Sequence, residues 1–373
     1  MAKHEMGEQT IVAKEHIAEF NQYISNVNTH DQFYDGVYER VRKIGYAGKR
    51  NNGLGIRFFI CEQFQKHNIQ MPGKKDNTET NIQNWLEVSP PNDSAQSRDN
   101  VYRMCFALEM NAVETEAFFL KSYLCRPFNF KDYKECVYYF CLNTKRTYSD
   151  AERLIAQVAK LTPKKVDKET RNIGIALSEI VEEEDFLKEM PKYLYEEHEQ
   201  RKTITEAIIG LEKQCRQIAN IEGRGSLLKA IYYDKQRQIG NIFLSRDKEG
   251  LEEKLGDYNN NYIITNFPLE TTLSNIKQHK AVTNDRCRRM LVLLYFYKFY
   301  GEQYNLCIQN GVHYSEVNLA SLYQQFEIAL DNELNKCGFV ELYYRNPYDA
   351  FFLSCAKKQD PLFEFRKMID LKE

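Results

Sequence analysis

The pattern of hydrophobic and polar positions is clearest between residues 78 and 126, where apolar residues recur every three or four positions. Residues at these intervals lie on one face of an α-helix, so the pattern predicts three short helices. Their apolar faces hold Ile82, Trp85 and Leu86, then Val101, Met104, Cys105 and Leu108, then Val113, Ala117, Leu120 and Leu124. We expect these helices to pack as one core.

Helical spacing continues on both sides of this segment. Before it, residues 10–44 predict two amphipathic helices that break near 28–31, and Ile56–His67 predicts another. After Leu86, four polar residues that can cap a helix predict helices near 98–109, 112–124, 130–142 and 150–160, because a side-chain oxygen at a helix start accepts from a free backbone amide. These capping residues are Ser97, Asn111, Asn129 and Ser149.

A polar connection at 162–168 is the expected boundary before a second set of helices. Helices are predicted near 199–222, 225–244 and 319–334, and a helix that is buried on most sides is predicted after Thr283. Two more begin at Asn346-Pro347 and Asp360-Pro361, because proline fits the first turn of a helix. The sequence therefore predicts an all-α chain, with a helical arm and basic loop at 1–50, a helical domain at 51–162 and a larger helical-bundle domain at 163–373.

Charge and cysteine content narrow the class of protein. The 373 residues have a formal net charge of −2, so any binding to nucleic acid or anionic lipid needs a local patch. Ten cysteines without a Cys-x-x-Cys pair or a secretory signal predict reduced thiols and no zinc site in a cytoplasmic protein. The longest apolar run, residues 290–297, is far shorter than the roughly 20 residues of a membrane span, so no membrane is expected.

Residues 40–57, which we call the basic window, contain six cations and no acidic residue. Four glycines in this window suggest a phosphate-binding loop. The nucleotide version is excluded because Gly48-Lys49 is followed by Arg50 rather than by Ser or Thr. A flexible basic loop and a solvated hinge remain as interpretations.

The sequence contains no motif that predicts catalysis. Its seven histidines lack the spacing of a metal enzyme, and no nucleophile elbow occurs, so we expect no enzymatic activity, no metal site and no cofactor. Arg286, Arg288 and Arg289 form a basic cluster that fits a salt-bridged helix start better than a phosphate site. Helix capping accounts for the Asn346–Asp349 segment.

Ile56–His67 together with residues 78–126 resembles the helix-turn-helix domain of lambda-repressor-like (XRE-type) transcriptional regulators. In this resemblance Ile82-Gln83-Asn84-Trp85-Leu86 corresponds to the end of the recognition helix, while Ser97–Val101 corresponds to the helix after it. The place of the supporting helix, near 69–77, holds Pro72 and Gly73. The chain also resembles a family of uncharacterised bacterial proteins that join such a core to a long helical tail with an Asn-Pro-Tyr-Asp segment.

The resemblance implies a recognition helix that displays Thr80, Asn81, Gln83 and Asn84. Asn and Gln can bond bidentately to the major-groove edge of adenine. Charge is balanced over residues 56–87, whereas residues 40–50 add five cations, so the basic window would supply most phosphate contacts. The predicted DNA-binding residues are Arg40, Arg42, Lys43, Lys49, Arg50, Arg57, Lys74, Lys75, Thr80, Asn81, Gln83 and Asn84.

Two functions fit these observations. The first is a DNA-binding transcriptional regulator, expected as a homodimer, that binds double-stranded DNA and uses its C-terminal helical domain for dimerisation or sensing. The second is a helical protein-interaction scaffold of a mobile-element or phage-related system, which binds a protein partner and does not read DNA. The basic window and the Asn/Gln-rich helix favour the first, whereas the interrupted supporting helix favours the second.

Overall fold

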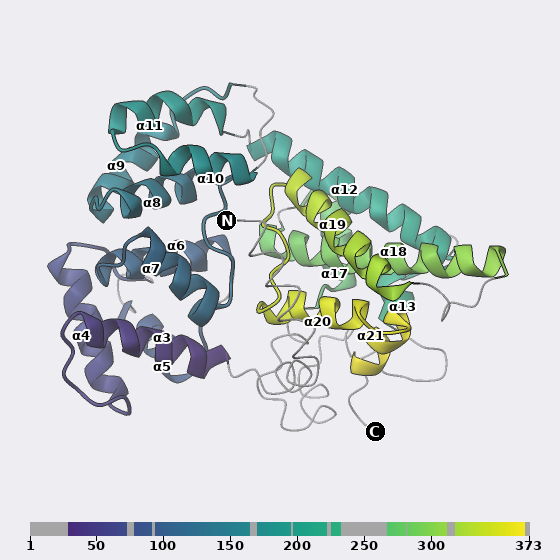
Figure 1. The fold of residues 1–373 in the computed structure, drawn as a ribbon, viewed down its shortest axis with the longest axis horizontal. Coiled ribbons are helices and arrows are strands. Elements are labelled where there is room, and N and C mark those ends of the chain that lie inside the picture. The colour runs from purple at the N-terminus through teal and green to yellow at the C-terminus, as the bar shows by residue number, and fades with distance from the viewer. Residues whose placement is uncertain are drawn as a thin grey trace.

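The computed structural model describes residues 29–72, 78–91, 94–164, 170–194, 197–221, 225–232, 267–280, 282–311 and 318–369. Regular structure in these ranges is helical throughout, with no strand (Figure 1). The predicted all-α class is therefore confirmed. The helix predicted before residue 28, and the greater part of the helix predicted at 225–244, lie outside the described residues.

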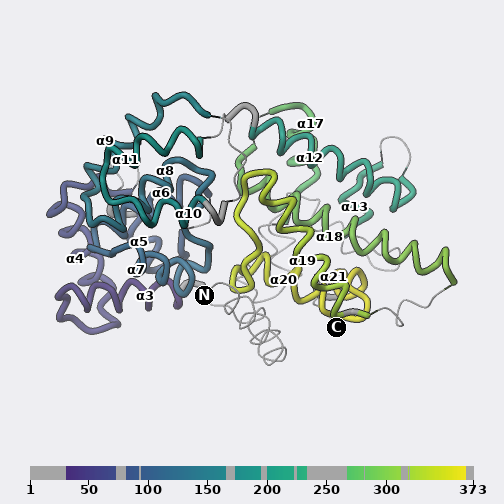
Figure 2. The backbone as a smooth tube through the Cα atoms, turned by 45° about the horizontal axis from the view of Figure 1, so that its top comes forward, coloured from purple at the N-terminus to yellow at the C-terminus, as the bar shows by residue number. Residues whose placement is uncertain are grey.

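The buried residues form two separate hydrophobic cores, which define a first and a second unit. Figure 2 shows the helices of the two units as two neighbouring groups. Buried residues of the first unit run from Phe33 to Tyr193, and those of the second run from Ile204 to Phe365. The two cores divide between Tyr193 and Ile204, which is later in the chain than the predicted boundary at 162–168. Ile173, Leu177 and Phe186 follow that boundary and are completely buried in the first core. Likewise, the segment after residue 29 packs into that core and does not extend from it as an arm.

The first unit is a compact array of short helices. They are α3 (Thr29–Lys43), α4 (Gly53–Lys66), α5 (Thr78–Glu87), α6 (Ala95–Ala107), α7 (Ala112–Phe118), the π-helix η1 (Phe119–Tyr123), α8 (Tyr133–Asn143), α9 (Tyr148–Val158), α10 (Thr170–Ser178), α11 (Glu183–Glu189) and the 3₁₀ turn η2 (Met190–Lys192). Gly36 lets α3 approach η1 closely, because a Cβ atom at this position would lie 2.0 Å from the Ser122 hydroxyl oxygen.

The second unit is organised around one long helix. Its elements are α12 (Glu197–Ile218), α13 (Leu227–Tyr232), α17 (Glu270–Lys277), α18 (Asn284–Gln309), α19 (Leu319–Lys336), α20 (Pro347–Ala356) and α21 (Pro361–Ile369). Helix α18 is buried continuously from Arg289 to Tyr297 and contacts α12, α17, α19, α20 and α21. The buried helix predicted after Thr283 is therefore confirmed.

The helix starts show where local sequence decides the fold. Asn111 forms the predicted capping box with Glu114, and Asn346 accepts hydrogen bonds from two amides at the start of α20. Three predicted caps are wrong, because Ser94, Asp132 and Thr147 fill the positions assigned to Ser97, Asn129 and Ser149.

Two of these differences have a visible cause. The Asn129 side chain instead reaches the second unit, where its amide donates to the Gly338 carbonyl oxygen over 3.2 Å. Thr147 forms a reciprocal capping box with Asp150, which satisfies two backbone amides together.

At the end of α19, Gly338 follows the C-cap with a φ of +76°, the left-handed conformation that ends a helix.

Candidate nucleic-acid interface and the junction between the units

Helices α4 and α5 pack against each other and against α3, in the region that resembles a helix-turn-helix. Ile82 and Leu86 of α5 are buried, and Trp85 contacts Phe33 of α3 edge to face. The apolar residues identified in the sequence thus attach α5 to the core. Asn84 lies on the exposed side of the helix.

The basic window is bound to neighbouring helices by its own cations. The Arg40 side chain is only 10% exposed and pairs with the Glu114 carboxylate at 2.9 Å. It also donates to the Leu108 carbonyl oxygen, over 2.7 Å, and to the Glu109 carbonyl oxygen. Lys43 pairs with the same Glu114 carboxylate. Two cations therefore hold α3 against the turn between α6 and α7.

Glu114 has a structural role that the sequence shows only in part. Its carboxylate accepts from the Asn111 amide in the capping box and also receives Arg40 and Lys43. Burial alone would raise the pKa of this carboxyl group, but the hydrogen bonds with Lys43 and Asn111 and the charge of Arg40 hold it below its ordinary value. The carboxylate is thus ionised and neutralises part of the basic window.

The other end of the window is neutralised by α3. The Arg50 guanidinium pairs with the Asp35 carboxylate at 2.5 Å and lies over the Tyr34 ring. Arg42 and Lys49 are exposed, while Arg57 is half-buried. Lys74 and Lys75 lie outside the described residues. The structure thus leaves Arg42 and Lys49 as the exposed cations of the window that enter no ion pair among the described residues.

The predicted base-reading side chains are also partly engaged. The Asn81 amide donates to the Pro72 carbonyl oxygen over 3.2 Å, and the Gln83 amide donates to the Glu87 carboxylate over 2.7 Å. Thr80 lies in α5, but its side chain is not among those described. Asn84 is exposed. Among the described residues of this predicted set, Arg40, Lys43 and Arg50 are paired with carboxylates, whereas Arg42, Lys49 and Asn84 are exposed.

A buried polar cluster near residue 98 had no sequence signal. The Arg98 guanidinium donates two hydrogen bonds, of 2.7 and 2.6 Å, to the Glu135 carboxylate and a third, of 2.9 Å, to the Arg126 carbonyl oxygen. The Tyr102 hydroxyl and the Asn129 backbone N–H also donate to Glu135, over 2.8 and 2.7 Å. This cluster fixes residues 126–129, which lead into the contact with the second unit.

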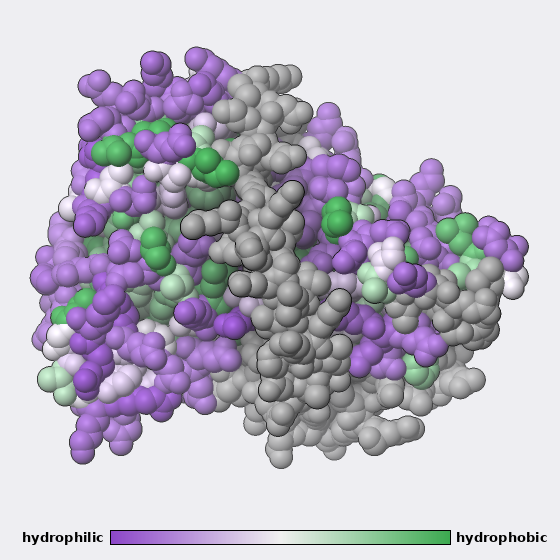
Figure 3. All heavy atoms as spheres, viewed as in Figure 1, coloured by the Kyte–Doolittle hydropathy of each residue, from purple (hydrophilic) through white to green (hydrophobic). Residues whose placement is uncertain are grey.

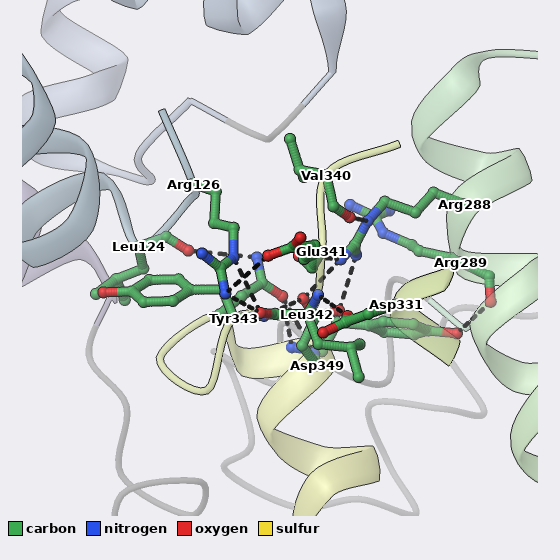
Figure 4. A network of polar contacts seen from close by, with 12 residues as sticks. Leu124, Arg126, Arg288, Arg289, Asp331, Val340, Glu341, Leu342, Tyr343 and Asp349 are labelled. Atoms are coloured by element: carbon green, nitrogen blue, oxygen red, sulfur yellow. Dashed lines mark hydrogen bonds and ion pairs between the residues drawn. The ribbon is translucent and has the colours of Figure 1, made fainter. Parts of the chain in front are cut away.

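Side chains and main-chain oxygens join the two units at residues 120–131 and 335–346, which we call the junction (Figure 4). The Arg126 guanidinium donates to the Leu342 carbonyl oxygen over 3.0 and 2.7 Å. The Tyr343 hydroxyl donates to the Leu120 carbonyl oxygen over 2.7 Å. Further bonds run from Asn346 to the Leu124 oxygen, from Asn129 to the Gly338 oxygen and from Lys131 to the Asn335 oxygen.

Within the second unit, Arg288 and Asp349 fix residues 340–343 of the junction. Arg288 forms two hydrogen bonds of 2.8 Å with the Asp349 carboxylate, which also accepts from the Tyr343 amide over 3.0 Å. The Arg288 guanidinium also donates to the Val340 and Glu341 carbonyl oxygens. The prediction of a salt-bridged helix start is therefore confirmed. Capping explains only part of the Asn346–Asp349 segment, because Asp349 is also the buried partner of Arg288.

Asp331 is the second carboxylate behind the junction. It accepts from the Leu342 amide over 2.7 Å, and the carbonyl oxygen of that same Leu342 accepts from Arg126. The pKa of Asp331 is raised to about 7, mainly by burial and also by the charges of Glu341 and Glu327, although the hydrogen bond from the Leu342 amide and the charge of Arg126 act in the opposite direction. Leu342 therefore connects the Asp331 carboxyl group of the second unit to the Arg126 guanidinium of the first unit.

The described residues contain no cluster of three or more side chains suited to holding a metal ion. All ten cysteines are free thiols and buried, and burial raises the pKa of Cys105 and Cys141 to about 12, so neither is a thiolate near neutral pH. No described helix combines the length and the apolar character needed to cross a bilayer.

Comparisons with protein-family models, with curated proteins and with solved structures found no match to this chain.

Proposed function

We propose that this chain is a helical protein-interaction scaffold, in which two units are held in a fixed arrangement so that each presents its surface to a protein partner. The observation that carries the proposal is the junction. Five side chains, those of Arg126, Asn129, Lys131, Tyr343 and Asn346, each donate to a main-chain oxygen of the opposite unit.

Bonds of this kind support a fixed arrangement because main-chain oxygens lie at fixed positions in a folded unit. Each donor also lies in a segment that is anchored within its own unit, by Glu135 on one side and by Asp349 on the other. Opening the junction would leave several polar groups without partners unless water replaced them, and this opposes hinge motion. A fixed arrangement of two surfaces suits a partner that contacts both.

DNA binding is the second candidate, and the exposed positions of Arg42, Lys49 and Asn84 favour it. The charge of the region argues against it as the main function. DNA affinity depends on cations that neutralise phosphates, whereas Arg40, Lys43 and Arg50 are already paired with carboxylates of the same chain. Breaking those pairs would have to precede phosphate contact.

A nucleic-acid titration separates the two candidates. Fluorescence anisotropy with DNA from beside the chain's own gene is measured at about 50 and 200 mM salt, the range over which phosphate-driven binding changes most. The scaffold proposal expects no sub-micromolar complex at the lower salt. Salt-sensitive, sub-micromolar binding that the Arg42→Gln/Lys49→Gln/Asn84→Ala variant abolishes would overturn it in favour of a DNA-binding regulator.

Crosslinking in the native host tests the scaffold directly. Wild-type chain and an Arg126→Ala/Tyr343→Phe variant are expressed at equal level, treated with a lysine-reactive crosslinker and mapped by mass spectrometry. We expect one protein to crosslink reproducibly to both units of the wild type. In the variant, crosslinks of that protein to one unit should no longer occur together with its crosslinks to the other unit. Absence of any crosslinked protein above the background of an unrelated helical protein would contradict the proposal.

A further inference from the structure

The outer surface of α10 and α11 exposes large aliphatic side chains beside carboxylates. Ile175 is 55% exposed and Val181 is 63% exposed, while Ile180 between the helices is half-buried. Together with the nearby carboxylates Glu179, Glu182, Glu184 and Asp185, these residues form what we call the α10–α11 surface. Figure 3 shows hydrophobic patches surrounded by hydrophilic surface where Figure 1 places these helices.

Ile175 and Val181 do not belong to the core of the first unit, whereas Ile180 is partly buried against it. Ile173, Leu177 and Phe186 on the inward sides of the same two helices are completely buried and supply the packing. A hollow of about 370 Å³ lies beside Ile180 and Val181, and its other lining side chains are charged: Glu179, Glu182, Asp185, Lys188 and Glu189. The hollow has room for an aliphatic or aromatic side chain of a partner.

Charge distinguishes this surface from an incidental apolar patch. Residues 179–189 contain six carboxylates and one lysine. Glu183 pairs with Arg146 and Arg153, and Glu189 pairs with Lys192. The other four carboxylates, Glu179, Glu182, Glu184 and Asp185, enter no ion pair among the described residues. Acidic residues at a helix start gain from the helix dipole, but Glu179 precedes the start of α11 and gains little from it.

We infer that the α10–α11 surface docks a basic amphipathic segment of a partner protein, with an apolar side chain in the hollow and Lys or Arg side chains beside the four carboxylates. This inference rests on the proposed scaffold function and names the chemistry of its partner. The carboxylates steer a cationic segment to the surface and add little affinity each, because rim charges stay solvated. Burial of the apolar side chain against Ile180 and Val181 supplies most of the binding free energy.

The inference is tested with full-length chain and a fluorescein-labelled 16-residue peptide of Leu and Lys, in which Leu repeats every three or four positions. One control peptide carries Ser in place of Leu, and another carries Glu in place of Lys. We expect micromolar binding of the Leu/Lys peptide, at least tenfold weaker binding of both controls, and weaker binding at high salt. Equal affinity for the Ser/Lys peptide would overturn the inference, because charge alone would then explain the complex.

Variants locate the binding on the molecule. Val181→Ser and Glu182→Gln/Asp185→Gln should each weaken the Leu/Lys peptide at least fivefold. Ile328→Ser is the matched control, because Ile328 is 64% exposed on α19 of the second unit, and it should leave the affinity unchanged. Wild-type affinity in both α10–α11 variants would refute docking at this surface. If a host protein still crosslinks to other surfaces of the chain, the scaffold proposal would remain supported. If no host protein crosslinks, both the scaffold proposal and the docking inference would be refuted.

Discussion

Replacing Glu135 should remove the central acceptor of the buried cluster in the first unit. Glu135 is 6% exposed and accepts from the Arg98 guanidinium, the Tyr102 hydroxyl and the Asn129 backbone N–H. Glu135→Ala would leave a buried guanidinium without its counter-charge, along with two neutral donors. Breaking a buried ion pair on one side destabilises a protein by roughly 3–5 kcal/mol. This is a large part of the 5–15 kcal/mol of a typical domain.

The chain offers a convenient probe for this measurement. Trp85 is the only tryptophan, and it packs on Phe33 in the core of the first unit, so tryptophan fluorescence during urea unfolding reports that unit. At a slope of roughly 2 kcal/mol per M urea, a loss of 3–5 kcal/mol lowers the midpoint by about 1.5–2.5 M. The control is Glu152→Ala on α9, where the glutamate is exposed, and its midpoint should stay within experimental error of wild type.

A double-mutant cycle separates the ion pair from general disruption. Arg98→Met alone leaves the Glu135 carboxylate buried without its cation, whereas Arg98→Met/Glu135→Ala removes both charges. We expect the double variant to be at least about 2 kcal/mol more stable than the sum of the two single effects implies, because neither charge is then left unpaired. Additive effects within about 0.5 kcal/mol would refute the view that Arg98 and Glu135 stabilise each other.

Two further predictions concern the junction and the packing of α3. Because burial raises the pKa of Asp331 to about 7, the folded state holds its proton more tightly than the unfolded state, and the free energy of unfolding should fall as the pH rises from about 4 to 7. Asp331→Asn should reduce that fall in urea unfolding followed by circular dichroism, and an unchanged pH profile would contradict the assignment. Gly36→Ala should destabilise the first unit by about 1–3 kcal/mol in the Trp85 assay, since its Cβ would overlap Ser122. Ser122→Gly should restore much of that loss, and Gly210→Ala, where nothing lies within 4 Å, should not destabilise; a fully tolerated Gly36→Ala would show that α3 and η1 can separate without loss.

The sequence predicted the helices well where the signal was local. The buried helix after Thr283 and the helix start at Asn111 each depend on residues within a few positions of one another. Helix starts were mispredicted where a neighbouring residue caps the helix instead: Thr147 forms a capping box with Asp150, and Asp132 caps α8 while the Asn129 side chain donates to the distant Gly338 carbonyl oxygen. The resemblance to lambda-repressor-like regulators stays a prediction.

The candidate site followed a similar division. The sequence identified the basic window and the Asn/Gln-rich face of α5, because both are continuous along the chain. It could not show that Glu114 neutralises Arg40 and Lys43, since the partners lie more than seventy positions apart. Nor could it find the junction, whose donors and acceptors are separated by more than two hundred residues.

By itself, the sequence determined that this protein is helical and which face of most helices is buried, because apolar spacing and capping act over one or two helical turns. The tertiary structure alone decided which charges are neutralised and which stay exposed, because a charge pairs with whatever the folded chain brings within a few ångströms. That decision removed much of the cationic character of the basic window and left the carboxylates of the α10–α11 surface without cationic partners among the described residues.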